Sequence, residues 1–332
     1  MKSENSKSRI DYIDTAKGLC MMFVIFVHIH FYFGCQYWGE LCLKSFYLPL
    51  FFMLSGLFFK PYSGFYEFIM RKINTILIPF LFFYYTTSVL LTWILALIRG
   101  KTLDWSLLWA FIVPEHYPNL PIWFLICLFV QCILFYFIYS LFKRSLLAMT
   151  GFVFLAGLVG INCRELGFDF PMQFDSALSA IPFFFIGWTA SKYGLLKKLD
   201  FNSSYLIMCA IAFLFIAYLF SGYVNYQKNQ FRCIPFNVYV SGIFGSFFVI
   251  CLSKLIRKIY LVRFIGRNSL VVLCTHQLLL QWYLQIIRKV GLGNWLTIFI
   301  TFVLVILSYF IVVPFMKWIF PMFVGQKNLF KV

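Results

Sequence analysis

Long apolar runs separated by short polar stretches make up most of the chain. A helix needs about 20 predominantly apolar residues to cross a bilayer, and the runs approach or reach that length repeatedly. The sequence therefore predicts an all-α polytopic membrane protein, a bundle of about ten transmembrane helices in a single domain over residues 1–332. The helices are expected at about 18–36, 45–59, 73–98, 121–142, 146–162, 174–191, 204–222, 235–253, 269–287 and 295–319, with tails at 1–17 and 320–332.

The positive charges are unevenly divided between the two sides that these helices define. With the N-terminus inside, twenty of the 28 Lys and Arg residues fall on the inner side and eight on the outer side. Cytoplasmic loops of membrane proteins carry such an excess. The sequence therefore predicts that both termini are cytoplasmic, in the inner (cytoplasmic) membrane of a bacterial-type cell.

Composition agrees with this class. Of 332 residues, 62% are hydrophobic and 12% are charged, and the charged fraction is about half that of an ordinary soluble domain. No interval between the apolar runs is long enough to bury a core of its own. The net charge of +17 is also found in nucleic-acid-binding proteins. Here the one-sided distribution favours membrane lipid as the partner and argues against nucleic acid.

The ten cysteines indicate no metal site, because they form no CxxC pair and no Cys/His spacing typical of zinc. Most lie in apolar runs, where cysteine behaves as a small core residue. The sequence leaves open whether four cysteines near the expected outer face form a disulfide. These four are Cys35, Cys42, Cys163 and Cys233.

Two ionisable residues on the first apolar run are the leading candidates for chemistry. Lys17 and His28 are eleven positions apart, which is about three helical turns plus 20° and a rise of about 16 Å. Both side chains therefore lie on one stripe of the helix, with Lys17 expected at the membrane surface and His28 near the bilayer centre. An ionisable side chain at that depth is a candidate functional residue. Asp14 is expected to cap this helix and to pair with Lys17.

Two further histidines lie in predicted spans. His30 points about 200° away from His28 around the helix, which favours an interhelical hydrogen bond as its role. For His276 the sequence leaves two roles open. It is either such a structural hydrogen bond or a partner that orients His28 or binds a substrate.

Several segments share their motifs and order with a known family. The first helix carries a basic residue, ten further residues and then a histidine. The segments are Ile10–His28, Leu48–Phe59, Arg71–Phe80, Ile122–Leu125 and Ile265–His276. Together they resemble the acyltransferase-3 family of integral membrane O-acyltransferases, which modify sugars and polysaccharides. The first motif is the most specific of them.

The resemblance implies a role for each matching residue. It implies a catalytic pair, a group that binds the acyl donor, and a group that binds the acceptor or orients the base. Many members carry two arginines three positions apart at the third helix, whereas here Asn74 follows Arg71 at that spacing. The implied residues are His28 and Lys17 for catalysis, Lys17, Arg71, Lys72 and Ser55 for the donor, and Trp123, His276 and Asn268 for the acceptor or for orientation, with Asp14 as a structural partner. Asn268 and its neighbour Ser269 are also expected to cap the ninth helix.

The resemblance implies transfer of an acyl group, most often acetyl, from cytoplasmic acetyl-coenzyme A to a hydroxyl of an extracytoplasmic or lipid-linked sugar. Histidine suits this chemistry because its reference pKa near 6.5 lets it take the hydroxyl proton. The sequence leaves open whether His28 acts as a base or forms an acetyl-histidine. It also leaves open the acceptor, the acyl group and the oligomeric state.

Two other functions are compatible with parts of the pattern. A proton-coupled transporter of a sugar or lipid-linked glycan would also use membrane histidines, and its helices could be broken at Pro79, Pro182 and Pro314. However, no predicted membrane interior contains an acidic residue, and no internal repeat is visible. A non-catalytic assembly subunit would not explain why Lys17 and His28 share a stripe.

Overall fold

The computed structural model describes residues 11–34, 39–113, 118–198 and 201–331, and this part of the chain is mostly helical. Each expected helix has a counterpart. The longer helices are α1 (Asp11–Phe31), α2 (Glu40–Leu57), α6 (Trp123–Phe142), α7 (Leu146–Asn162), α8 (Phe174–Lys192), α10 (Ser203–Leu219), α11 (Pro235–Leu255), α13 (Ser269–Ile287) and α14 (Asn294–Ile319).

The remaining expected helix is one continuous helical segment, Phe65–Ile98, which contains two π-helical stretches. Its parts are α3 (Phe65–Lys72), η1 (Ile73–Leu77), α4 (Ile78–Phe83), η2 (Tyr84–Leu90) and α5 (Leu91–Ile98). The short helices are η3 (Trp105–Leu108), η4 (Ala110–Ile112), η5 (Leu120–Ile122), η6 (Pro171–Gln173), α9 (Leu195–Lys198), α12 (Tyr260–Arg267) and η7 (Arg288–Val290).

The only sheet among the described residues is a hairpin between α10 and α11. Its strands, β1 (Val224–Asn225) and β2 (Gln230–Phe231), pair antiparallel with Val224 opposite Phe231. Asn229 adopts a positive φ of 46° at the end of the turn, a conformation that asparagine tolerates better than most residues. The all-helical expectation missed this hairpin.

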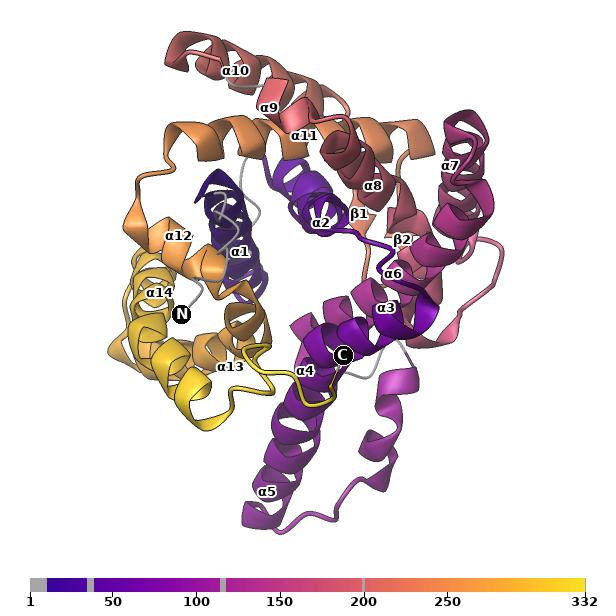
Figure 1. The fold of residues 1–332 in the computed structure, drawn as a ribbon. Coiled ribbons are helices and arrows are strands. Elements are labelled where there is room, and N and C mark those ends of the chain that lie inside the picture. The colour runs from indigo at the N-terminus through magenta and orange to yellow at the C-terminus, as the bar shows by residue number, and fades with distance from the viewer. Residues whose placement is uncertain (1–10, 35–38, 114–117, 199–200, 332) are drawn as a thin grey trace, which may run out of the picture.

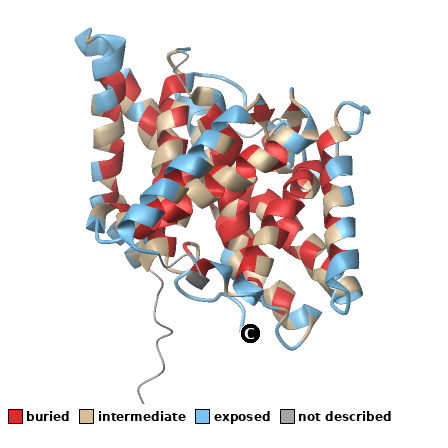
Figure 2. Cartoon of the chain, turned by 90° about the horizontal axis from the view of Figure 1, so that it is seen from above, coloured by how far each residue is buried: buried red, intermediate tan, exposed pale blue. Residues whose placement is uncertain are grey.

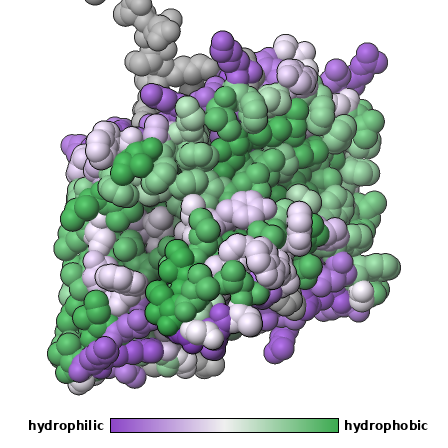
Figure 3. Space-filling model, turned by 90° about the horizontal axis from the view of Figure 1, so that it is seen from below, coloured by the Kyte–Doolittle hydropathy of each residue, from purple (hydrophilic) through white to green (hydrophobic). Residues whose placement is uncertain are grey.

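Helices surround α1 and α2 on several sides. Figure 1 shows α10 and α11 above this pair, α12 to α14 on one flank, and α6 to α8 on the other. Seven of the described helical segments are long and apolar enough to cross a membrane. Figure 3 shows apolar residues over most of one face, with hydrophilic residues gathered mainly toward two opposite edges. The chain is thus built as a multi-pass membrane protein.

The interior is filled by apolar and aromatic side chains. Buried residues occupy the centre of the bundle in Figure 2, and exposed residues lie on its outside and at its ends. Pro182 and Pro314 lie inside α8 and α14, and both helices continue through them.

The proximal end is defined here as the end of the bundle where α1 begins, and the distal end as the end where α1 finishes.

The expected bounds of the first helix, 18–36, are wrong. α1 already includes Asp11 and ends at Phe31. Its acidic first turns stay helical because Arg263 and Arg267 of α12 bind their carboxylates. Arg263 Nη1 lies 2.9 Å from Asp11 Oδ2, and Arg267 Nε lies 3.0 Å from Asp14 Oδ2. This ion-paired cluster therefore extends α1 at its proximal end.

The earlier start changes where the candidate residues lie along α1. Asp14 is buried within the helix, so the expected cap at this residue is wrong. Lys17 lies six residues after Asp11, and His28 lies three residues before Phe31. His28 is therefore closer to the distal end of α1 than to its middle.

Close backbone contact holds α12 against α1. A Cβ atom on Gly266 would lie 1.7 Å from the backbone oxygen of Asp14. Only glycine fits at such a contact, which is how small residues allow membrane helices to approach each other. The same contact places Arg267 beside the carboxylate of Asp14, and this hydrogen bond raises the pKa of Arg267 above its ordinary value.

The C-terminal segment packs against the start of the long third helical segment. Asn74 is 2% exposed. Its Oδ1 accepts hydrogen bonds from the backbone N–H groups of Leu329 and Phe330, at 3.0 and 2.9 Å, and its Nδ2 donates to the Phe330 carbonyl. Asn74, which departs from the arginine spacing of the family, thus binds the C-terminal segment of the chain.

The thiols of Cys42, Cys163 and Cys233 are free, whereas Cys35 lies outside the described residues. No cluster of metal-ligating side chains occurs within the described ranges.

Candidate active site

Two histidines from different helices meet inside the bundle. His28 Nδ1 of α1 lies 2.8 Å from His276 Nε2 of α13, and the two rings stack with centroids 5.0 Å apart at an angle of 15°. His276 is fully buried. Its other nitrogen, Nδ1, lies 3.0 Å from the carbonyl oxygen of Val272. The bundle therefore brings together residues that are 248 positions apart in sequence.

These contacts determine which nitrogen carries each proton when both rings are neutral. The Val272 carbonyl can only accept a hydrogen bond, so His276 Nδ1 carries a proton and donates it. His276 Nε2 then has the lone pair and accepts from His28 Nδ1–H. The remaining nitrogen of His28, Nε2, therefore carries a lone pair. The hydrogen bond to His276 thus selects one tautomer and one ring orientation of His28. Metal-binding and catalytic histidines are commonly oriented by a partner in this way.

His28 lines a cavity of about 360 Å³ in the distal half of the bundle, termed here the distal cavity. Trp123 at the start of α6 lines it as well, as does the hairpin that includes β1. The volume lies within the range of cavities that hold small molecules.

A second cavity, of about 400 Å³, lies in the proximal half and is termed the proximal cavity. Lys17 of α1 and Lys72 of α3 both line it, and so do Ser55 of α2 and Ser269 at the start of α13. No carboxylate is among the described residues that line it. It is therefore a cationic chamber. Lys17 Nζ also lies 5.0 Å from the centroid of the Phe58 ring, a distance typical of a cation–π contact.

The two cavities meet at a wall of three apolar side chains. Phe51, Phe124 and Leu273 line both cavities and are termed the shared wall. The rings of Phe51 and Phe124 pack with centroids 5.7 Å apart. Lys17 and His28, on one helix, therefore open into two adjoining chambers, one on each side of this wall.

Comparison of the sequence with known protein families agrees with this geometry. The model of the acyltransferase-3 family, described as an acyltransferase domain, matches residues 10–316, which is nearly the whole chain. The chain belongs to the acyltransferase-3 family. It is accordingly a membrane acyltransferase, and the family assignment does not favour the transporter alternative. No curated protein and no solved structure matches the chain.

The structure of this acyltransferase brings together most of the residues expected at the site. His28, His276 and Trp123 gather at or beside the distal cavity, and Lys17, Lys72 and Ser55 gather at the proximal cavity. The Ser55 hydroxyl donates to the Phe51 carbonyl at 2.8 Å, so its oxygen is left to accept hydrogen bonds.

Two expected residues lie away from both cavities. Arg71 pairs with Glu67 one turn earlier, at 2.7 Å, and lies over the Tyr62 ring. Asn268 occupies the N-cap position of α13, as expected, but its side chain does not cap the helix. Instead, its Nδ2 donates to the Phe264 carbonyl at 2.7 Å.

His30 packs away from the site, as its helical angle predicts. Its ring lies 4.4 Å from the Phe26 centroid and 5.7 Å from the Trp295 centroid of α14, and it does not line the distal cavity.

Sequence reasoning missed several polar residues around the distal cavity. Gln277 Nε2 and Gln281 Nε2 both donate to the Tyr32 hydroxyl oxygen, at 2.6 and 3.0 Å. Gln277 Oε1 is buried without a hydrogen-bond partner among the described residues, and Gln277 and Tyr32 both line the cavity. One signal was present in the sequence, because Gln277 directly follows His276 in an otherwise apolar run.

Proposed function

We propose that this acyltransferase moves a short acyl group, typically acetyl, from acyl-coenzyme A in the proximal cavity to a sugar hydroxyl in the distal cavity. The observation that carries the proposal is the meeting of two chemically different chambers at one apolar wall. Lys17 and Lys72 line one chamber, and the hydrogen-bonded His28 and His276 lie at the other.

The proximal cavity has the charge that the donor requires. Coenzyme A carries several phosphate charges, and lysine binds phosphate as a point charge. Lys17 and Lys72 supply positive charge from two sides, and Ser269 contributes a hydroxyl. With the phosphates held there, the thioester points toward the shared wall and His28.

His28 supplies the base. Its Nε2 takes the proton of the acceptor hydroxyl while the hydroxyl oxygen attacks the thioester carbonyl carbon. A carbon–oxygen bond forms, the carbon–sulfur bond breaks, and the thiolate of coenzyme A takes the proton from Nε2. The hydrogen bond from Nδ1–H to His276 stabilises the imidazolium between these two transfers. A covalent acetyl-histidine on Nε2 is the alternative route, and it would release coenzyme A before acceptor is added.

Neutral polar groups suit the acceptor side. Gln277 Oε1, which has no partner among the described residues, can accept a hydrogen bond, and the Tyr32 hydroxyl can donate one. Both properties match a ligand that carries hydroxyls. Trp123 adds an aromatic surface. These groups support a sugar as the acceptor.

For topology, we propose that the proximal end faces the cytoplasm, where acyl-coenzyme A is present, and that both termini lie on that side. The division of the 28 Lys and Arg residues supports this orientation. Reporter fusions after Leu199 and after Val332 should read cytoplasmic, and a fusion after Glu115 should read external. An external reading at Val332 would overturn the ten-helix arrangement.

The direct test is transfer of labelled acetyl groups. Membranes that contain the protein should move label from acetyl-coenzyme A onto a glycan fraction, and membranes that contain the His28→Ala variant should not. A protein that accumulates glycan across the membrane without labelling it would instead be a transporter.

A further inference from the structure

Two more cavities follow the distal cavity toward the outside of the bundle, each adjoining the one before it. The first is a pocket of about 610 Å³ between the start of α2 and the chain that follows α10, termed the side pocket. It shares Lys44, Tyr223 and Val224 with the distal cavity. The side pocket therefore adjoins the cavity that His28 lines.

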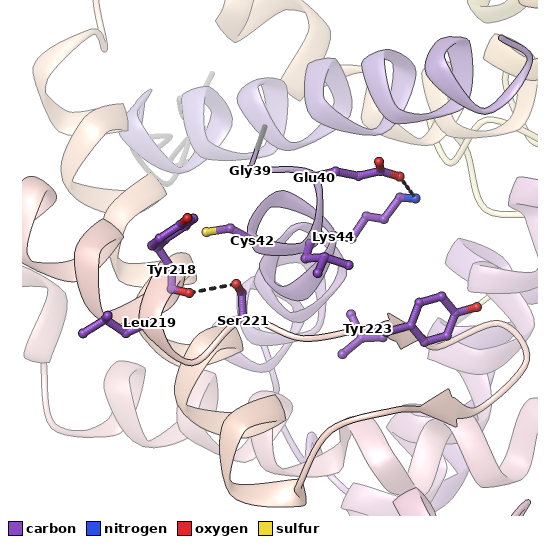
Figure 4. Close-up of a pocket in the computed structure, with 10 residues that line it drawn as sticks. Gly39, Glu40, Cys42, Lys44, Tyr218, Leu219, Ser221 and Tyr223 are labelled. Carbon is purple, nitrogen blue, oxygen red and sulfur yellow. Dashed lines mark hydrogen bonds and ion pairs between the residues drawn. The ribbon is translucent and has the colours of Figure 1, made fainter. Parts of the chain in front are cut away.

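The side pocket is lined by groups that bind hydroxyls. Figure 4 shows Glu40 and Lys44 joined by an ion pair on one side, with Tyr223 across from them. The Ser221 hydroxyl donates to the Tyr218 carbonyl at 2.8 Å, which leaves its oxygen available as an acceptor. Because Glu40 neutralises Lys44, the lining favours an uncharged, hydroxyl-rich ligand over an anion.

The second cavity is an apolar groove of about 560 Å³ between α10 and the α1–α2 pair, termed the lateral groove. It shares Gly39, Cys42 and Tyr218 with the side pocket. Figure 4 shows the Cys42 thiol at this junction, pointing toward Tyr218.

The lateral groove opens on the outer surface of the bundle. Two of its lining residues on α10, Ile211 and Phe215, are 64% and 60% exposed. In a membrane protein such a surface faces hydrocarbon, because apolar side chains here contact lipid tails and not water.

Polarity changes in one direction along this series. The lateral groove is apolar, the side pocket presents an ion pair and hydroxyls, and the distal cavity presents His28. An ordinary membrane lipid explains the groove alone, but not its continuation into a hydroxyl-binding pocket that reaches a catalytic base. A ligand with a hydrocarbon tail and a sugar head matches all three cavities in order.

We infer that the acceptor is a glycan carried on a membrane lipid, which reaches His28 sideways from the bilayer between α10 and α2. Its hydrocarbon tail lies in the lateral groove, the sugar nearest to the lipid lies in the side pocket, and the sugar that reacts lies in the distal cavity. This inference rests on the proposed function. Of the two acceptor classes that the family resemblance implies, an extracytoplasmic and a lipid-linked sugar, it selects the lipid-linked one.

The first test measures binding and needs no activity. The protein is held in lipid nanodiscs, and the rate at which N-ethylmaleimide alkylates Cys42 is followed by peptide mass spectrometry. Octyl glycosides of glucose, galactose and N-acetylglucosamine are the probes, with the matching methyl glycosides and 1-octanol as controls. At least one octyl glycoside should slow alkylation about tenfold relative to its methyl counterpart, because the tail buries further methylenes. Equal protection by 1-octanol would show a groove for ordinary lipid only and would overturn the inference.

The second test uses transfer from labelled acetyl-coenzyme A to the same glycosides. Ile211→Trp fills the lateral groove and should lower kcat/KM for the octyl glycoside about tenfold while leaving the methyl glycoside unchanged. Met208→Trp is the matched control, because Met208 lies one turn away on α10, is 63% exposed and does not line the groove. Equal losses in both variants, or equal use of methyl and octyl glycosides by the unaltered protein, would contradict lateral access. A complete absence of transfer to membrane glycans would instead contradict the proposed function, while Cys42 protection would still report on the groove.

Discussion

The proximal and distal cavities are built from the same helices yet differ in chemistry. α1, α2, α6 and α13 contribute to both, but two lysines and no described carboxylate line the proximal cavity. The distal cavity is surrounded by a pair of imidazoles, several neutral polar groups and one lysine, Lys44, which is paired with Glu40. A charged side chain inside such an apolar bundle is energetically costly, so it is expected either to pair with another group or to serve a function. Under the proposed function, this difference keeps the site that binds the anionic donor apart from the site that abstracts a proton.

The shared wall keeps these two functions close. Phe51, Phe124 and Leu273 separate the chambers by single side chains. Under the proposed function, a thioester held on one side would therefore lie next to the base on the other. The arginines of α12, which are the other concentration of positive charge near α1, are already bound to Asp11 and Asp14. They stabilise the fold, whereas Lys17 and Lys72 face a chamber lined by no described carboxylate.

The most damaging change to this arrangement should be the loss of the distal base. His28→Ala should lower transfer about 10²–10⁴-fold, because general base catalysis contributes that much. The protein level in the membrane should stay largely intact. His30→Ala is the control two positions away, because its ring packs on Phe26 and Trp295. Near-normal activity of His28→Ala in the labelled acetyl assay would exclude His28 as the base.

Loss of the partner histidine should be the next largest effect. His276→Ala removes the acceptor for His28 Nδ1–H and should lower kcat about 10–100-fold, as loss of an orienting partner does for histidine ligands. Both Michaelis constants should change little. His276→Gln offers an amide oxygen as acceptor and should recover part of kcat. If the glutamine and alanine variants were equally impaired in steady-state kinetics, the orienting role would be wrong.

Opening the shared wall should change which acyl group is used. Leu273→Ala enlarges the space between the chambers and should raise the use of butyryl-coenzyme A relative to acetyl-coenzyme A by about tenfold, the scale at which methylene-sized differences are discriminated. Leu270→Ala makes the same change at a residue that lines only the proximal cavity. Competition assays with both thioesters should leave the preference of Leu270→Ala unchanged. An equal shift in the two variants would show that the wall does not select the acyl group.

Removing a cation from the proximal cavity should have the smallest effect. Lys72→Ala should raise the KM for acetyl-coenzyme A about fivefold, the scale of one partly exposed ion pair, with little change in the KM for the acceptor. Lys17→Ala should behave similarly, and Lys17→Arg should be milder because the charge is kept.

Arg71→Ala sharpens the same prediction. Arg71 is held by Glu67 and Tyr62, so its loss should raise the donor KM less than the loss of Lys72. Lys143→Ala is the control for a charge outside both cavities. Donor titrations in which Arg71→Ala exceeds Lys72→Ala would place the coenzyme on the Arg71 side of α3.

Much of the helical arrangement is predictable from sequence because lipid imposes a simple rule. Every backbone polar group in the bilayer has to be satisfied internally, so long apolar runs form helices. The expected spans therefore have counterparts among the described helices, with errors at their ends. The largest error is at α1, where Asp11 and Asp14 interrupt the apolar pattern but are neutralised by arginines about 250 residues later. No local pattern contains that information.

The candidate site also has one part that the sequence predicts and another that only the structure shows. The spacing of Lys17 and His28 on one helix follows from local geometry alone. Which face of Arg71–Lys72 meets the proximal cavity depends on how α3 packs, and the structure places Lys72 there. Asn74 stands where many members of the family carry the second arginine. Only the structure shows that its side chain binds Leu329 and Phe330.

The amino-acid sequence by itself determined the class of protein, the approximate helices and the stripe that carries Lys17 and His28, because hydrophobicity and helical period are local properties. Tertiary structure alone decided that His276 binds His28 and leaves its Nε2 with a lone pair, and that Phe51, Phe124 and Leu273 separate two chambers. These facts depend on contacts between distant helices, and such contacts arise only when packing has chosen which faces meet.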